Sequence, residues 1–163
     1  MTAPDLGAAS ATLQPDDTFR QAARAAMWPH VQRLLELEAQ MRDPEATDDL
    51  KRYRVATRRL RAALRVFAQA LPRRTARDVT PELRDLARAV GRVRDLDVRI
   101  DGLHEWATRR GTATVGHVEP LRARWVGERA TAAAELEPRL TGKRHARLLD
   151  DLADLVTASR AHP

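Results

Sequence analysis

The stretch from Leu50 to Arg77 constrains the fold of this chain more than any other feature. It carries ten basic residues and no acidic one, whereas the remainder of the 163-residue chain has more acidic than basic side chains. Apolar residues recur in it at every third or fourth position, which is the period of an amphipathic helix. Such a helix buries one face in a core and presents charge on the other, so we expect a helical domain built around this stretch.

The composition favours helices throughout the chain. There are 29 alanines but only 7 glycines and six aromatic residues, and alanine is the strongest helix former while aromatic residues favour strands. We predict an all-α fold, an antiparallel bundle of four to five helices. The expected helices cover residues 16–42, 43–71, 80–106, 119–136 and 143–159, with a loop at 111–117.

Prolines supply most of the expected helix boundaries. Asp43-Pro44-Glu45 and Thr80-Pro81-Glu82 have the form of a helix start, in which a capping residue precedes a first-turn proline and an acidic residue. Pro29 is expected to kink or restart the first helix, and Pro138 is expected to end the fourth, because proline removes a backbone hydrogen bond.

The second predicted helix has two distinct faces when its residues are placed at about 100° per residue. Its core stripe holds the apolar residues and one threonine: Tyr53, Ala56, Thr57, Leu60, Ala63, Leu64, Phe67 and Leu71. A basic row lies on another face, at spacings of three and four residues: Lys51, Arg54, Arg58, Arg61 and Arg65. Like charges at these spacings repel one another. The row is therefore either a solvated basic face or a site for a phosphate-rich anion.

The third predicted helix places charged residues on its apolar face. Arg94, Asp97 and Asp101 fall on the same side as Val90, whereas Asp95 is expected to point outward. Charged groups that face inward need partners. Two interpretations are open: an internal ion pair of Arg94 that sets the helix register, or an extension of the basic row by Arg94 with Asp97 orienting one of its arginines.

Several chemistries lack the residues they need. The chain has no cysteine, which excludes disulfides, thiolate zinc sites and a cysteine nucleophile. Its two serines lie near the chain ends, and its histidines show no metal-ligand spacing and are expected at the surface or in helix caps. We predict a non-catalytic protein without metal or cofactor.

The expected organisation is a disordered tail at residues 1–15 followed by one domain at 16–160. No run approaches the ~20 apolar residues of a membrane span, and the start of the chain does not have the pattern of a signal peptide. We therefore expect a cytoplasmic protein with no membrane partner.

The chain resembles the conserved histidine α-helical domain (CHAD) family in two runs, KRYRVATRRLRAALRVF at 51–67 and VGRVRDLDV at 90–98, and more loosely over residues 19–156. The resemblance implies a helical domain that binds inorganic polyphosphate through basic side chains. We therefore expect the protein to associate with polyphosphate granules in the cytoplasm. The residues at the family's basic positions are Arg54, Arg58, Arg59, Arg61 and Arg94. Together with the basic row, they give the predicted site: Lys51, Arg54, Arg58, Arg59, Arg61, Arg65 and Arg94.

The chain departs from the family pattern in two respects. Lys51 stands where the family has its name-giving histidine, which replaces a titratable ring by a permanent charge. The family domain also has two related halves, and this chain resembles one of them. A homodimer could supply the second half, and Val55, Ala62 and Val66 form a small apolar strip that could serve as its contact.

The sequence is also compatible with two other functions and with a compositional origin of its arginine content. A basic helix could follow a nucleic-acid backbone, but Tyr53 and Phe67 belong to the core stripe and leave no stacking platform for bases. The chain could also be a structural or partner-binding helical module. The ratio of 27 arginines to two lysines is also what a GC-rich genome produces.

Overall fold

The computed structural model describes residues 13–40 and 47–157. These ranges contain five α-helices and a short 3-10 helix, and they contain no strand. The helices are α1 (Phe19–Gln40), α2 (Thr47–Val66), α3 (Arg73–Thr108), α4 (Thr112–Thr141) and α5 (Lys143–Thr157), with η1 (Ala68–Ala70) between α2 and α3. The predicted all-α bundle is confirmed. The predicted tail at 1–15 lies mostly outside the described residues, and Gln14 to Asp17 form a turn that leads into α1.

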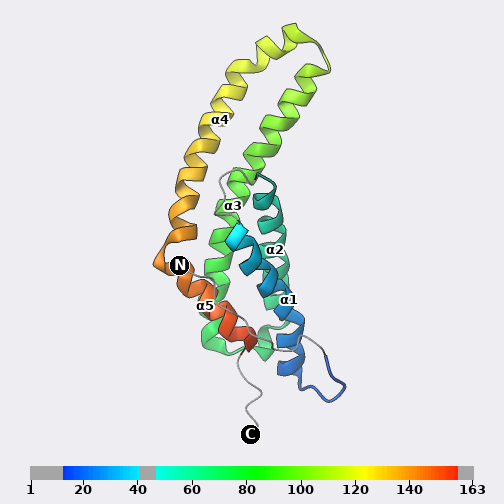
Figure 1. Ribbon diagram of the computed structural model, residues 1–163, viewed down its shortest axis with the longest axis vertical. Coiled ribbons are helices and arrows are strands. Elements are labelled where there is room, and N and C mark those ends of the chain that lie inside the picture. Colours follow the sequence, from blue (N-terminus) through cyan, green and yellow to red (C-terminus); the bar gives the residue numbers. More distant parts are fainter. Residues whose placement is uncertain (1–12, 41–46, 158–163) are drawn as a thin grey trace.

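Helix α3 is the central element of the bundle. It packs against α2, α4 and α5, while α1 packs against α2 and α5. Figure 1 shows that α3 and α4 form a long hairpin whose far end extends beyond the other helices. The first half of α3 therefore contributes to the core, and α2 lies between α1 and α3 with its remaining face open.

The core stripe predicted for α2 is buried as expected. Tyr53 and Leu60 are fully buried, and Ala63 and Phe67 are partly buried against the core. Thr57 is also fully buried, and its hydroxyl donates to backbone carbonyl oxygens one turn earlier in α2, which satisfies this polar group inside the helix. The heptad-like run of leucines in α5 is buried as well.

Phe19 is exposed, although the other large apolar residues of α1 are buried. Phe19 is 58% exposed, because it lies in the first turn of α1, and its ring contacts Phe67 near the end of α2. Met27 and Trp28, which the sequence pattern did not single out, are buried in the core instead.

The prolines do not set the helix boundaries as predicted. Helix α1 continues through Pro29, which lies on its exposed side, where a carbonyl that lost its partner can bind water. Helix α3 starts at Arg73, eight residues before Pro81 and directly after Pro72, which takes the N-cap position, and Val79 of the added turns is fully buried. The predicted start at Asp43-Pro44-Glu45 lies outside the described residues.

Glycines end the helices of the long hairpin. Helix α4 continues through Pro138 to Thr141 and ends at Gly142, where a Cβ would lie 2.7 Å from the Pro138 carbonyl oxygen. The loop expected at 111–117 is only a tight turn around Gly111, whose φ of 101° suits glycine. Helix α4 therefore begins seven residues before the predicted start at Glu119.

Three buried polar side chains meet between α1, α2 and α5. His145 Nε2 lies 2.9 Å from Glu38 Oε1, and both side chains are almost fully buried. The nearby Tyr53 phenol is also buried, and burial, followed by the charge of Glu38, raises its pKa well above the ordinary value. The expectation that all histidines lie at the surface or in caps is wrong for His145, because α5 packs this position onto α1.

Candidate functional site

An open hollow of about 490 Å³ lies between α2 and α3. Three arginines of the basic row, Arg54, Arg58 and Arg61, line it from α2. They occur there because the row lies beside the core stripe of α2, so that burying the stripe turns the row toward the flank of α3. The hollow is therefore positively charged along its whole α2 side.

Helix α3 supplies two further arginines that the sequence analysis missed. Arg88 and Arg92 line the same hollow together with Ala87, Gly91 and Asp95. Their spacing of four residues puts them on one face of α3, and this spacing is the signal that could have found them. They lie outside the acid-free stretch at 50–77, so the charge count did not draw attention to them.

Gly91 lies in the wall of this hollow. It is buried, and a Cβ built at this position would lie 3.9 Å from Nε of Arg54. This is an ordinary van der Waals distance, so the Arg54 side chain lies directly across Gly91. A side chain longer than a methyl group at position 91 would extend into the space beside the Arg54 side chain.

Carboxylates pair with three of the five arginines. Arg54 Nη2 lies 3.5 Å from Asp95 Oδ1, and Arg88 Nη1 lies 3.7 Å from Asp85 Oδ1. Arg92 donates a hydrogen bond of 2.9 Å to Glu135 of α4. Within residues 13–40 and 47–157, no carboxylate pairs with Arg58 or Arg61. Five arginines and a single carboxylate line the hollow, and two of these arginines have no pairing carboxylate in those ranges.

The other predicted site residues of α2 lie outside this hollow. Lys51 and Arg65 are exposed and continue the row about one turn beyond Arg54 and Arg61. Arg59 is exposed but belongs to a different face of α2. The structure therefore brings together Arg54, Arg58 and Arg61 of the seven predicted residues. Lys51, Arg59 and Arg65 lie at or beyond the margin of the hollow.

Arg94, the seventh predicted residue, belongs to a separate charge network. It lies 3.7 Å from Asp97, and both side chains are largely buried. Asp97 also accepts a hydrogen bond from Arg129 of α4. This agrees with the first interpretation of Arg94, an internal ion pair, and the network ties α3 to α4. Asp101 is exposed, contrary to its predicted inward position.

The profile of the CHAD domain family matches residues 25–163 of the chain. The chain belongs to the CHAD family. CHAD domains in general bind polyphosphate, and the positive hollow is compatible with that class of ligand. A search of curated proteins and a search of solved structures returned no match. In the described part of this CHAD domain, no helix is long and apolar enough to cross a membrane.

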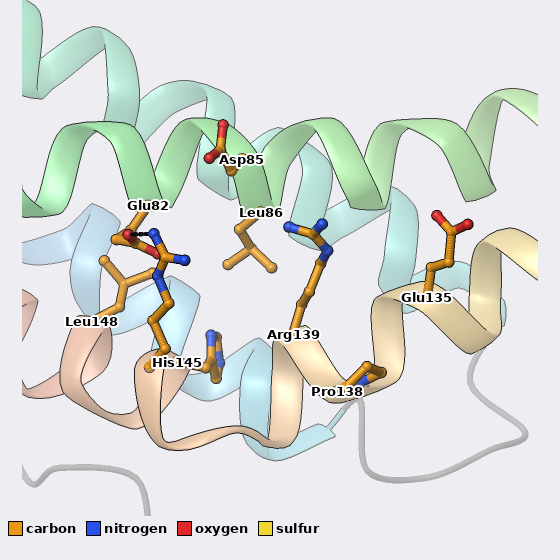
Figure 2. A pocket seen from close by; sticks show the side chains of 9 residues that line it. Glu82, Asp85, Leu86, Glu135, Pro138, Arg139, His145 and Leu148 are labelled. Carbon is orange, nitrogen blue, oxygen red and sulfur yellow. Dashed lines mark hydrogen bonds and ion pairs between the residues drawn. The ribbon is translucent and has the colours of Figure 1, made fainter.

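The CHAD domain has a second hollow, of about 520 Å³, between α3, α4 and α5 (Figure 2). Figure 2 shows Arg139 extending from α4 toward α3, with Glu135 farther along α4. Arg144 forms an ion pair with Glu82, and this contact raises the pKa of the Arg144 guanidinium. Three carboxylates and two arginines line this hollow, so its charges largely neutralise one another.

Proposed function

We propose that this CHAD domain binds inorganic polyphosphate in the hollow between α2 and α3 without catalysing a reaction. The observation that carries the proposal is the convergence of Arg54, Arg58 and Arg61 with two arginines of α3 on one open surface. A guanidinium group can donate two parallel hydrogen bonds to phosphate oxygens. A chain of phosphates places one negative charge at each unit, which would relieve the repulsion within the row.

A longer polyphosphate would extend along α2 beyond the hollow. Lys51 and Arg65 prolong the row at its two ends, and both side chains are free to meet solvent. We assign them flanking contacts. Arg59 lies off the row and Arg94 is paired with Asp97, so neither has a direct contact in the proposal.

Nucleic acid is the second candidate, because its backbone presents the same phosphate chemistry. Among the residues that the structure describes, no aromatic residue lines the hollow, and Tyr53 and Phe67 pack in or against the core. Bases would therefore gain no stacking contact, whereas a flexible phosphate chain needs none.

Competition between the two ligands tests the proposal. Long-chain polyphosphate bound to the protein is displaced with unlabelled polyphosphate or with duplex DNA, at equal phosphate concentration and fixed salt. We expect polyphosphate to compete at least about tenfold better, because the duplex holds its phosphates on a rigid curve. Equal or better competition by DNA would favour the nucleic-acid function.

The proposal extends to location and assembly. We propose that the protein lies in the cytoplasm at polyphosphate granules, and imaging of a labelled chain would test this location.

We also propose a homodimer whose contact is the strip of Val55, Ala62 and Val66. Val66 is 71% exposed, but Val55 is partly buried, so the strip offers less apolar surface than its three residues suggest. Light scattering with and without polyphosphate would detect the dimer, and a monomer in both conditions contradicts it.

A further inference from the structure

We infer that Asp95 and Glu135 are internal competitors of the ligand: they hold Arg54 and Arg92 in the empty hollow, and an incoming phosphate chain displaces them. The inference rests on the proposed function, since it concerns the same hollow. It assigns the two carboxylates a role in selecting the ligand, because only an anion stronger than a carboxylate can take over both arginines.

Asp95 is placed to compete for Arg54. Among the described residues it is the one acidic residue that lines the hollow, and its carboxylate lies 3.5 Å from the Arg54 guanidinium. Both side chains are more than half exposed, at 52% for Arg54 and 56% for Asp95. At this separation the contact is an ion pair without a close hydrogen bond. A phosphate oxygen that enters the hollow can therefore replace the carboxylate without leaving a buried charge unpaired.

Glu135 competes for Arg92 from the opposite side. It lies on α4, across a shallow groove between α3 and α4 that Arg92 and Asp95 also line. Its hydrogen bond of 2.9 Å directs the Arg92 guanidinium toward α4. Arg92 borders both spaces, so it can turn to a ligand in the α2–α3 hollow once that bond is broken. Both side chains are about half exposed, which leaves them room to separate.

The two unpaired arginines would receive the ligand first. Arg58 and Arg61 have no carboxylate partner in the described part of the chain, so a first phosphate meets them without breaking a pair. Further phosphates reach Arg54 and Arg92 only by displacing Asp95 and Glu135. Exposed ion pairs of this kind are weak. Removing one competitor should therefore improve the affinity by a small factor.

Titration calorimetry with tripolyphosphate tests the inference on the full chain. Asp95→Asn and Glu135→Gln should each bind tripolyphosphate about two- to fivefold more tightly than the unmodified protein. Glu105→Gln is the matched control, since it removes the same charge from an exposed ion pair with Arg109 on the distant part of α3. Its affinity should not change. Circular dichroism checks that all variants are folded.

A double-mutant cycle separates competition from a general loss of negative charge. If Asp95 acts by occupying Arg54, the gain from Asp95→Asn disappears in the Arg54→Gln background. A gain that persists in that background means a general field effect and overturns the inference. An unchanged or weaker tripolyphosphate affinity of Asp95→Asn also overturns the inference, because Asp95 would then orient Arg54 or have no effect on binding.

The same titrations distinguish failure of the inference from failure of the proposed function. If the unmodified protein binds tripolyphosphate and Arg58→Gln weakens this binding, the proposed site stands whatever the carboxylate variants show. If neither the unmodified protein nor Asp95→Asn binds tripolyphosphate or long-chain polyphosphate, both the site and the competition are wrong.

Discussion

The two hollows beside α3 are similar in size but differ in the balance of basic and acidic residues that line them. The hollow between α2 and α3 has five arginines and one aspartate in its lining. The hollow between α3, α4 and α5 has two arginines and three carboxylates. Asp85 and Glu135 link them, since both line the second hollow and pair with Arg88 and Arg92 of the first. An arginine-rich surface therefore becomes a candidate anion site only where carboxylates do not already neutralise it.

Charge reversal at the first hollow should have the largest effect. Replacing Arg54, Arg58 and Arg61 by glutamate should lower the affinity for polyphosphate by about 100-fold or more, because three attractive contacts become repulsive. These side chains point away from the core stripe, so the helical fold should survive. Titration calorimetry measures the affinity and circular dichroism the fold.

The matched control reverses charge at the second hollow. Arg139→Glu combined with Arg144→Glu changes the net charge in the same direction at residues that line only the mixed-charge hollow. We expect less than about a threefold loss of affinity, from the general field alone. Undiminished affinity in the first variant, or an equal loss in this one, would remove the proposed difference between the hollows.

Filling the first hollow should have an intermediate effect. Gly91→Leu extends a side chain into the space beside the Arg54 side chain, and we expect about a fivefold or larger loss of polyphosphate affinity, equivalent to losing one charge-assisted contact. Gly91→Ala should keep its affinity, since its Cβ makes an ordinary contact, and should stabilise α3 by up to about 1 kcal/mol. Thermal unfolding measures the second effect.

Gly102→Leu provides the comparison for this series. It adds the same side chain to α3, but nothing lies within 4 Å of the added Cβ. Its polyphosphate affinity should equal that of the unmodified protein. A loss of affinity in Gly102→Leu as large as in Gly91→Leu would mean that the effect comes from α3 as a whole and not from the hollow.

The buried face of α2 should affect stability without affecting binding. Burial raises the pKa of Tyr53, so the folded state retains the phenolic proton more strongly than the unfolded state. The contribution of this pKa difference to the free energy of unfolding is therefore fully present below the pKa of about 10 in the unfolded state, and it is lost as the pH rises beyond that value. Tyr53→Phe should lose less stability than the unmodified protein between about pH 10 and 11 in urea unfolding.

Polyphosphate affinity at neutral pH supplies the control for Tyr53→Phe. It should match that of the unmodified protein, since Tyr53 is fully buried and does not line the hollow. A loss of affinity would show that the two faces of α2 are coupled.

The smallest expected effect is that of pH on binding. Arginine and lysine side chains remain charged from pH 5.5 to 8, so the affinity for long-chain polyphosphate should change by less than about twofold. His145 cannot act as a hidden contact, because it is buried against Glu38. A larger fall in affinity across this range would indicate that a titrating group outside the lining of the hollow contributes to binding.

Local periodicity was enough to predict the fold class and the arginines on the α2 side of the hollow that we propose as the site. The stripe that contains Tyr53 and Leu60, and the row that contains Arg54, Arg58 and Arg61, follow from the 3.6-residue turn of a helix. That relation depends only on sequence neighbours. Helix ends were predicted less well: α3 starts at Arg73 instead of near Thr80, and α1 continues through Pro29, because a local proline signal does not register how the helix packs in the bundle.

The other side of the site depends on which helices pack together. Arg88 and Arg92 face the row only because α3 lies against α2, and Glu135 reaches Arg92 across 43 residues of sequence because α4 folds back along α3. The pairing of Arg54 with Asp95 and the burial of His145 have the same origin. Coulomb interactions fall off with distance in space. The sequence alone therefore determined which residues carry charge, and only the tertiary structure decided which of those charges are neutralised and which remain available to a ligand.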